Sequence, residues 1–363
     1  MSPKCAVLIT VASFLLISPL YAQSIPFDST RWTFTAQEWE VMEYQGKQAL
    51  RLKGGGAWVR DLDVVDGVIE FDVAFPSTRS FTGVAWRVQD PQNFEQFYFR
   101  PHQSGNPDAN QYTPVFNATS GWQLYHGPAY GTPIEYKYDE WMHVRIVFKA
   151  GRGEVYLDSN EPVLFIPEMK RPIQSGTVGF TTSALAPGYF ANLTVREDAS
   201  VTLNGSPPEA PAIPPGMIMS WQVSNAFPDS TTIAEAVTLD ESVTSGLTWT
   251  TLPAEATGIT NLARVQGRQA GNTAFARLVL ESASQQVKTL RFGYSDRVKV
   301  YFNDRLIYGG DNTFQSRDYR YLGTIGLFDE LYLPLEPGRN EVWFAVTEGF
   351  GGWGIMAQVG SGE

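Results

Sequence analysis

Alternation of hydrophobic and polar residues is the dominant pattern along this chain, and it predicts β-strands. The clearest run is residues 68–75 (VIEFDVAF), in which the hydrophobic side chains share one face and Glu70 and Asp72 share the other. Further alternating runs occupy residues 81–88, 94–100, 141–150, 154–158 and 176–181 in the first half, and 275–280, 288–293 and 297–302 in the second. The runs are short, glycine and proline separate them, and long helical periodicity is scarce. The sequence therefore predicts an all-β protein.

A proline-rich segment divides this pattern into two blocks. Five prolines fall between residues 207 and 215, at Pro207, Pro208, Pro211, Pro214 and Pro215. Such a composition is typical of an extended, semi-rigid linker. We therefore predict two β-sandwich (jelly-roll) domains, at residues 23–198 and 220–363, joined by a linker at residues 199–219.

The N-terminus has the features of a secretory signal. Lys4 precedes an apolar run at residues 6–17, and Ala22 is a small residue just before a cleavage point at Gln23. Residues 1–22 are predicted to be this signal, and an uncleaved anchor is the alternative. Cys5, the chain's single cysteine, lies inside it, so the mature chain would have no disulfide. This combination favours a bacterial periplasmic or secreted protein.

Particular motifs add a resemblance to known families. Trp141-x-x-Val-Arg-Ile-Val, a glycine turn, Val155-Tyr-Leu-Asp and the ending Phe190-x-Asn-Leu-Thr-Val195 resemble the concanavalin A-like (laminin-G/pentraxin-like) jelly-roll domain over residues 27–195. Val300-Tyr-Phe-Asn-Asp and the strand at residues 343–346 resemble the galactose-binding-like jelly rolls appended to glycoside hydrolases. The resemblance implies the fold, but the concanavalin A-like fold carries lectins, adhesion modules, glucanases and sugar-binding domains alike.

Charge narrows the class of partner. The formal net charge is −11 at pH 7, which opposes binding to nucleic acid or anionic lipid. We therefore expect no nucleic acid partner and, after signal cleavage, no membrane association. Neutral sugars, peptides and calcium remain compatible with this charge.

The stretch after the predicted strand at residues 94–100 is the main candidate site. Residues 101–121 show little periodicity, so we expect a long irregular insertion that returns near Trp122. Aromatic rings can stack on the C–H face of a sugar while polar side chains bond its hydroxyls, so we predict carbohydrate binding here. The candidate ligand-binding residues are Arg100, His102, Asp108, Gln111, Tyr112, Trp122, Gln123, Tyr125 and His126. Alternatively, the same side chains pin the loop to the sandwich, with Arg100 and Asp108 as a structural ion pair.

No catalytic residue is assigned. The chain has neither a Gly-X-Ser-X-Gly nor a His-Glu-X-X-His motif. Glu70-Phe-Asp72 is similar to the start of the catalytic strand of laminarinase-like glucanases, but the third carboxylate is missing. The first alternative function is a glycan hydrolase that uses carboxylates such as Glu95 and Asp108. The second is a periplasmic or surface module that binds protein. His143, within an alternating strand, is expected to be structural.

Two further features leave alternatives open. Calcium could be held by Asp90 with Asn93, or by Asp108 with Asn106 and Asn110, although no complete calcium-loop signature is present, and no other cofactor is expected. In the second block, Trp353 lies in the glycine-rich sequence GFGGWG at residues 349–354. Trp353 is a candidate either for stacking on a ligand or for filling the core.

Overall fold

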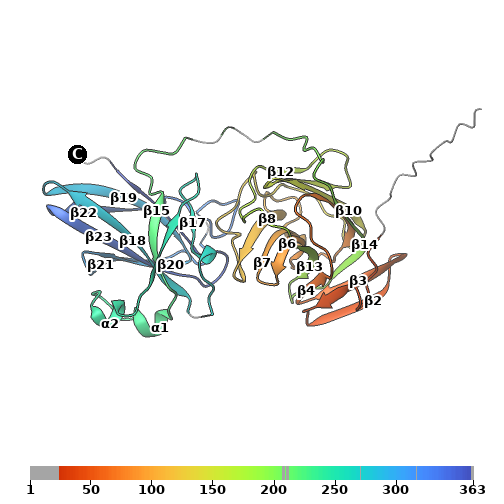
Figure 1. The fold of residues 1–363 in the computed structure, drawn as a ribbon, viewed down its shortest axis with the longest axis horizontal. Helices are drawn as coiled ribbons and strands as arrows, with labels where there is room; N and C mark the ends of the chain where they lie inside the picture. The colour runs from red at the N-terminus through yellow and green to blue at the C-terminus, as the bar shows by residue number, and fades with distance from the viewer. Residues whose placement is uncertain (1–23, 207–208, 210–211, 270, 316, 361–363) are drawn as a thin grey trace, which may run out of the picture.

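The computed structural model describes residues 24–206, 209, 212–269, 271–315 and 317–360 (Figure 1). Strands dominate this part of the chain, which confirms the predicted all-β class. The predicted signal at residues 1–22 lies outside the described residues. Within them, no helix has the length and apolar character needed to cross a bilayer.

The first fourteen strands form two seven-stranded antiparallel sheets, here called the N-terminal sandwich (Figure 1). In spatial order, the first sheet contains β1 (Trp32–Phe34), β4 (Gly55–Val59), β13 (Thr177–Thr182), β6 (Thr82–Asp90), β7 (Asn93–Phe99), β8 (Asn110–Phe116) and β9 (Thr119–Ser120). The second contains β12 (Leu164–Ile166), β11 (Arg152–Leu157), β10 (Met142–Lys149), β5 (Gly67–Ala74), β14 (Gly188–Glu197), β3 (Lys47–Lys53) and β2 (Glu38–Tyr44). A short 3₁₀ helix, η1 (Pro101–Gln103), follows β7.

The core between these sheets follows the predicted alternation. Ile69 and Phe71 of β5 are fully buried and pack in one cluster with Phe97 of β7 and Phe180 of β13. On the opposite face of β5, the Asp72 carboxylate accepts hydrogen bonds from neighbouring polar groups instead. Each large hydrophobic side chain buried in this way contributes about 1.5–3 kcal/mol to folding.

Strand β6 departs from the prediction at one point. Val84 and Trp86 lie in the inner core as expected, but Val88 packs on the outer face with Phe94. The pairing register with β13 shifts at this place, and Arg87 between them has a positive φ of 47°. The irregularity adds one residue to β6 relative to β13. The alternation predicted for the whole run at residues 81–88, which would put Val88 on the face of Val84 and Trp86, is therefore wrong at Val88.

The remaining strands form a second pair of antiparallel sheets, the C-terminal sandwich. Its larger sheet contains β16 (Trp249–Pro253), β15 (Ser220–Ser224), β18 (Thr273–Ser282), β23 (Gly338–Thr347), β20 (Arg297–Phe302) and β21 (Arg305–Asp311). Its smaller sheet contains β17 (Thr260–Asn261), β24 (Gly354–Val359), β19 (Gln286–Ser295) and β22 (Asp329–Leu335). Phe292 of the smaller sheet and Phe344 of the larger one meet in its core, with ring centroids 5.5 Å apart.

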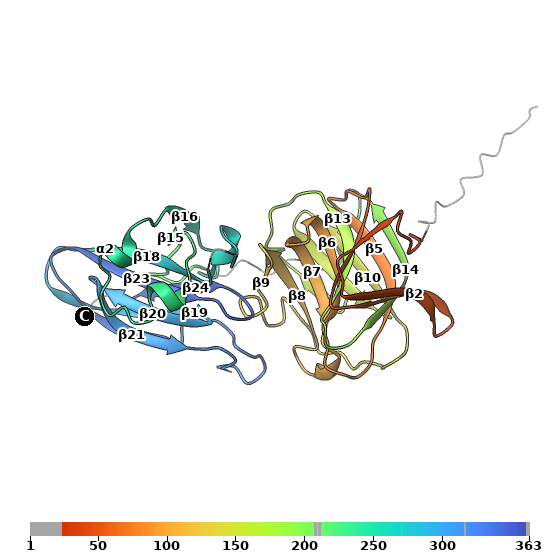
Figure 2. The same cartoon turned by 90° about the horizontal axis from the view of Figure 1, so that it is seen from below.

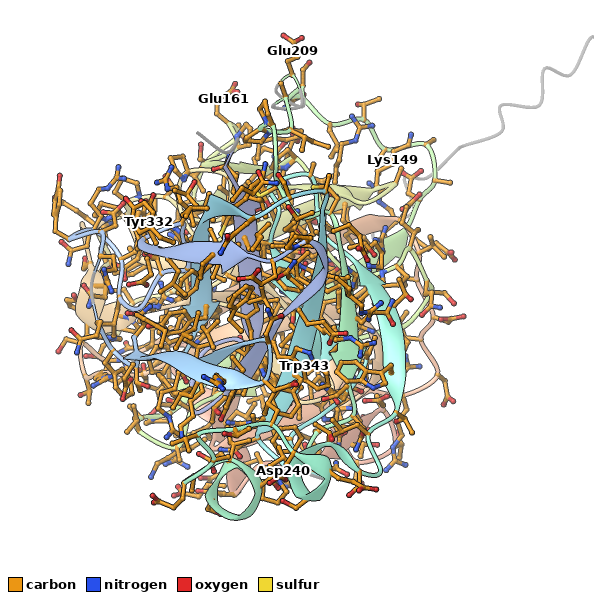
Figure 3. All side chains as sticks on the ribbon, turned by 90° about the vertical axis from the view of Figure 1, so that its left-hand side faces the viewer. Lys149, Glu161, Glu209, Asp240, Tyr332 and Trp343 are labelled. Atoms are coloured by element: carbon orange, nitrogen blue, oxygen red, sulfur yellow. The ribbon has the colours of Figure 1, made fainter. Side chains whose placement is uncertain are left out.

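The described residues of this second half also form short helices, namely α1 (Asp229–Thr232), α2 (Glu241–Thr244) and the 3₁₀ helix η2 (Leu262–Arg264). The outer face of the larger sheet carries a separate hydrophobic cluster that includes Phe275 and Trp343 and is covered by the segment containing α1 and α2. Figure 3 shows Trp343 on this side, with Asp240 at the start of α2. The Asp240 carboxylate caps α2 by accepting the N–H of Ser242 at 2.9 Å.

Residues 101–121 are more regular than predicted. They contain β8, which pairs with β7 over six residue pairs from Phe94–Val115 to Phe99–Asn110. All seven residues of β8 are buried, so the strand shows no hydrophobic alternation. The expectation of a long irregular insertion is therefore wrong, because buried polar residues occupy a covered strand.

Candidate functional site

The outer face of β7 forms the floor of a cleft. Because side chains alternate along a strand, Gln96, Tyr98 and Arg100 point away from the core that holds Phe97 and Phe99. Tyr98 lies opposite Gln111 of β8, and its hydroxyl donates to Gln111 Oε1 at 3.0 Å.

A hydrogen-bond network orders this floor. Arg100 Nη2 donates to the Tyr98 hydroxyl at 2.6 Å and also to Gln111 Oε1. Arg100 Nη1 donates to the carbonyl of Asp108 at 2.8 Å and lies 3.7 Å from its carboxylate. Gln111 Nε2 donates to the carbonyl of Trp122 at 2.8 Å. The network fixes the Arg100 side chain and the loop that carries Trp122.

Both sandwiches line the cleft, which has a volume of about 770 Å³. Leu322 and Phe350 come from the C-terminal sandwich, and the other lining residues come from the N-terminal one. The lining residues are Arg79, Phe81, Gln96, Tyr98, Arg100, His102, Gln103, Asp108, Ser120, Trp122, Ser183, Leu185, Leu322 and Phe350. Figure 2 shows β8 and β9 on the side of the N-terminal sandwich that faces the other sandwich.

Aromatic rings form two walls of the cleft. Phe81 contacts Tyr98, at 6.0 Å, and His102, at 5.5 Å, measured between ring centroids. Trp122 and Phe350 form a second group, in an edge-to-face arrangement with centroids 5.5 Å apart. These rings, together with exposed Leu185 and Leu322, offer apolar surface beside the polar floor.

Burial shifts the titration of two groups in the cleft. It lowers the pKa of His102, and the nearby charges of Arg79 and Arg100 lower it further, so the imidazole is neutral at pH 7. Burial raises the pKa of Asp108, although the charge of Arg100 opposes the shift.

The segment from Trp122 to His126 joins the two sandwiches. Gln123 donates its N–H to the Gly351 carbonyl at 2.8 Å, and its side-chain oxygen accepts the Ser295 hydroxyl at 2.6 Å. Leu124 and Tyr125 pack in one cluster with Ile325 and Met356. The sandwiches therefore meet in a bonded, hydrophobic junction beside the cleft.

An ionic contact reinforces this junction. The Tyr125 hydroxyl donates to Glu255 at 2.5 Å. Lys170 Nζ lies 2.9 Å from the same carboxylate, and its side chain is only 4% exposed. Because this carboxylate compensates the buried ammonium, breaking the contact would leave Lys170 with a charge that Glu168 alone would have to balance.

The glycine-rich segment at residues 349–354 places Phe350, rather than Trp353, at the cleft. Trp353 is fully buried in the C-terminal core, where its indole N–H donates to the Val346 carbonyl at 2.9 Å. Gly351 has φ of 110°, and a Cβ there would lie 2.6 Å from the Trp122 ring. Glycine is required here because the loop both adopts a positive φ and passes close to Trp122.

The predicted site residues fall into two sets. Arg100, His102, Asp108 and Trp122 line the cleft together. The others do not line it: Gln111 and Tyr112 are buried in β8, Gln123, Tyr125 and His126 lie in the junction segment, and Trp353 is in the core. His126 contacts Tyr321 at 5.5 Å, and burial lowers its pKa.

Sequence reasoning missed Arg79, Phe81 and Leu185, which lie on loops of the N-terminal sandwich, and Leu322 and Phe350 from the C-terminal one. The alternation of β7 did place Gln96 and Tyr98 on the face of Arg100. Phe350 lies in the glycine-rich segment that the sequence singled out, although Trp353 was the residue chosen there.

The carboxylates considered for catalysis have structural partners. Glu95 is fully buried on the inner face of β7 and accepts the Tyr112 hydroxyl at 2.7 Å. Asp72 lies 2.7 Å from Lys47 Nζ and 2.9 Å from His143 Nδ1. The expectation of a structural His143 agrees with this contact.

The residues considered for calcium also engage one another. Asp90 accepts hydrogen bonds from Asn93, and Asn106 donates to Gln103 at 2.6 Å. Asn110 is buried and donates to the Thr132 carbonyl at 2.9 Å. In the described ranges, no three His, Cys, Asp or Glu side chains are arranged to hold a metal.

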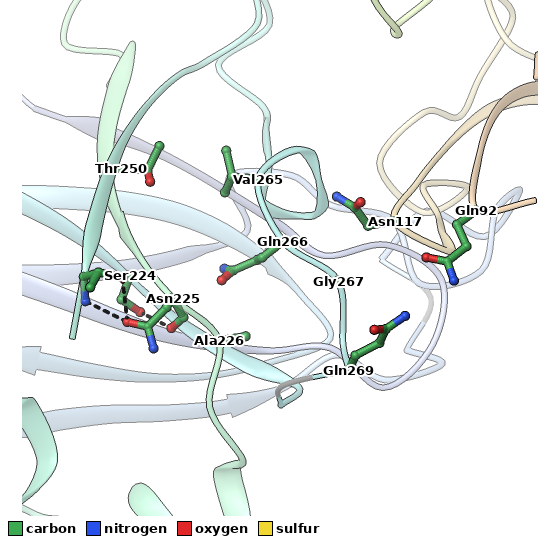
Figure 4. A pocket seen from close by; sticks show the side chains of 11 residues that line it. Gln92, Asn117, Ser224, Asn225, Ala226, Thr250, Val265, Gln266, Gly267 and Gln269 are labelled. Carbon is green, nitrogen blue, oxygen red and sulfur yellow. Dashed lines mark hydrogen bonds between the residues drawn. The ribbon is translucent and has the colours of Figure 1, made fainter. Parts of the chain in front are cut away.

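A second hollow of about 460 Å³ lies between the sandwiches (Figure 4). Asn117 and Gln92 border it on the N-terminal side, and Ser224 and Asn225 border it on the opposite side, with Gln266 between them. Its lining contains amides and hydroxyls but no aromatic ring. The first cleft therefore has the broader chemistry for ligand binding.

Comparison with known proteins gives no family assignment. No family model matches the chain, and no curated protein matches it. Similar solved structures include the carbohydrate-binding module CBM66 from Bacillus subtilis, with 15% identity over 47% of this chain and 100% of that chain, and a TM-score of 0.36. A protein of unknown function with a galectin-like fold from Bacillus subtilis has 13% identity over 49% and 95%, with a TM-score of 0.37. A Bacillus licheniformis beta-glucanase has 7% identity over 49% and 96%, with a TM-score of 0.35.

Proposed function

We propose that this protein binds carbohydrate without catalysis, in the cleft between its two sandwiches. The observation that carries the proposal is the combination of apolar and polar surface in a space of about 770 Å³. Phe81, Trp122 and Phe350 offer ring surface for the C–H face of a sugar. Gln96 and His102 offer polar groups for its hydroxyls. The predicted signal supports an exported location.

The carboxylates favour binding over hydrolysis. Glycoside hydrolases commonly use two carboxyl groups that are about 5–10 Å apart across the scissile bond. Asp108 supplies the one carboxylate of the cleft lining, and it faces Arg100. Glu95, the other acid considered for this chemistry, points to the opposite side of β7. A hydrolase would therefore need a second acid from outside the lining.

A glycan array on the purified protein, followed by calorimetric titration of each ligand found, tests the proposal. Trp122→Ala and Phe81→Ala should each weaken binding at least about tenfold, because each removes a ring from a wall of the cleft. Trp39→Ala is the matched control: Trp39 is 46% exposed, lies on β2 and stacks on Phe34, away from the cleft.

Two results would count against the proposal. One is the absence of any glycan ligand for a folded wild-type protein. The other is equal weakening of binding by Trp39→Ala and by the two cleft variants, which would mean that binding does not depend specifically on the cleft. Release of reducing sugar from a bound glycan would instead favour the hydrolase.

A further inference from the structure

One corner of the cleft carries an uncompensated positive charge. Arg79, on the loop between β5 and β6, is exposed, and its guanidinium carbon lies 6.0 Å from the centre of the Phe81 ring. Among the described residues, Arg79 has no hydrogen-bond or ion-pair partner. Arg100 differs, because Tyr98 and Asp108 engage its guanidinium. Of the cleft residues that the structure describes, Arg79 is therefore the cation left free to bind a ligand.

His102 lies at the same corner. Its ring meets the Phe81 ring edge-on, with centroids 5.5 Å apart and an interplanar angle of 81°. In the described part of the chain, neither ring nitrogen of His102 has a hydrogen-bond partner, and Nδ1 is buried without one. Phe81 thus contacts both a free guanidinium and an unpaired imidazole.

We infer that this corner recognises an anionic substituent on the bound glycan, such as the carboxylate of a uronic acid or a sulfate ester. The inference rests on the proposed carbohydrate binding. A guanidinium can donate two parallel hydrogen bonds to a carboxylate or sulfate, and an imidazole N–H can supply another. The neighbouring rings would meanwhile contact the apolar face of the sugar.

The overall charge of −11 does not prevent this recognition. Charges in salt solution are screened over about 8–10 Å, so groups near the ligand determine the local potential. The described lining of the cleft contains two arginines, Arg79 and Arg100, and one acid, Asp108. The carboxylate of Asp108 is paired with Arg100. An anion at the Phe81 corner would therefore meet net positive charge.

Calorimetric titration at low salt with three ligands tests this inference. They are an oligosaccharide of galacturonic acid, its methyl ester, and a sulfated neutral oligosaccharide. We expect the acid or the sulfated sugar to bind about fivefold to tenfold more tightly than the ester, since Arg79 is exposed and its charge is screened. Arg79→Gln should abolish this preference, because the affinity for the charged sugar should fall to that for the ester. Arg305→Gln, at an exposed arginine on β21 without a side-chain partner among the described residues, should change neither.

Each outcome supports or overturns the inference. A preference for the carboxylate identifies a uronic acid, and a preference for the sulfated sugar identifies a sulfate ester; both support it if Arg79→Gln removes them. Equal binding of acid, ester and sulfated sugar, or a preference that survives Arg79→Gln, overturns it. Binding of neutral glycans alone, lost in Trp122→Ala, overturns it while leaving the proposed function intact. Failure of the folded protein to bind any glycan overturns both this inference and the proposed function.

Discussion

Replacing Glu348 by glutamine should make the stability of the C-terminal sandwich less dependent on pH. Glu348 follows β23, is 1% exposed, and has one carboxylate oxygen without a hydrogen-bond partner in the described chain. Asp296, also fully buried, accepts the N–H groups of Gly349 and Phe350 at 2.7 and 2.5 Å. Two buried acids therefore lie beneath the loop that brings Phe350 to the cleft.

The magnitude follows from the protonation of Glu348. Burial raises the pKa of Glu348 from 4.5 to about 8, with a further contribution from the charge of Asp296. Between these values the folded chain holds a proton that the unfolded chain has released. The contribution of Glu348 to stability should therefore be greatest below pH 4.5 and fall by about 1.4 kcal/mol per pH unit up to pH 8. The total loss has an upper bound of about 5 kcal/mol.

Urea unfolding at a series of pH values between 5 and 9 measures this effect. Glu348→Gln is neutral throughout, so its free energy of unfolding should lack this decline and exceed that of wild type above pH 8. Glu341→Gln, on the preceding strand β23, is the control. Burial alone would raise the pKa of Glu341, but hydrogen bonds from Trp343 and Arg339 lower this pKa below 4.5. Glu341 is therefore ionised in both the folded and the unfolded chain above pH 5, and its replacement should leave the pH slope unchanged.

Parallel stability curves for wild type and Glu348→Gln across this range would refute the reasoning. They would mean that Glu348 is already ionised in the folded protein at pH 5.

Two further substitutions test the junction and the N-terminal sandwich. Gly351→Ala should destabilise the junction by about 1–3 kcal/mol, since alanine is strained at this positive φ and its Cβ would lie 2.6 Å from Gln123. Differential scanning calorimetry should show a lower melting temperature, whereas Gly309→Ala, in open space, should not; equal effects would contradict this. Burial alone would raise the pKa of Asp72, but hydrogen bonds, of which the one from His143 has the largest effect, lower this pKa from 3.8 to about 2. The stability that ionised Asp72 contributes is therefore lost as the pH falls from about 4 to 2. Asp72→Asn should flatten the acid-unfolding curve over that interval, and an unchanged curve would show that Asp72 titrates normally.

The fold class was predictable because strand alternation is a local property. Ile69 and Phe71 lie in the core, as the two-residue period requires. The same period placed Tyr98 and Arg100 together on the outer face of β7. Strand β8 was not predicted from the sequence, because both of its faces are covered and its residues do not alternate. Asn110 and Gln111 are therefore buried in a strand that shows no hydrophobic pattern.

The candidate site was only partly predictable, because residues distant in sequence complete it. Arg100, His102 and Trp122 were identified from an aromatic and polar stretch, but Phe350 reaches the same cleft from the other sandwich. Nothing in the local sequence specifies that the two sandwiches pack at this segment.

The sequence by itself determined the alternating strands such as β5 and β7, their inward faces and a stretch rich in binding chemistry, since these depend on neighbouring residues. The tertiary structure alone decided which of those side chains face a cavity. It buried Tyr125 against Glu255 in the junction, put Trp353 in the core and presented Phe350 instead. The physical reason is that burial depends on the packing of one sandwich against the other, which no local periodicity encodes.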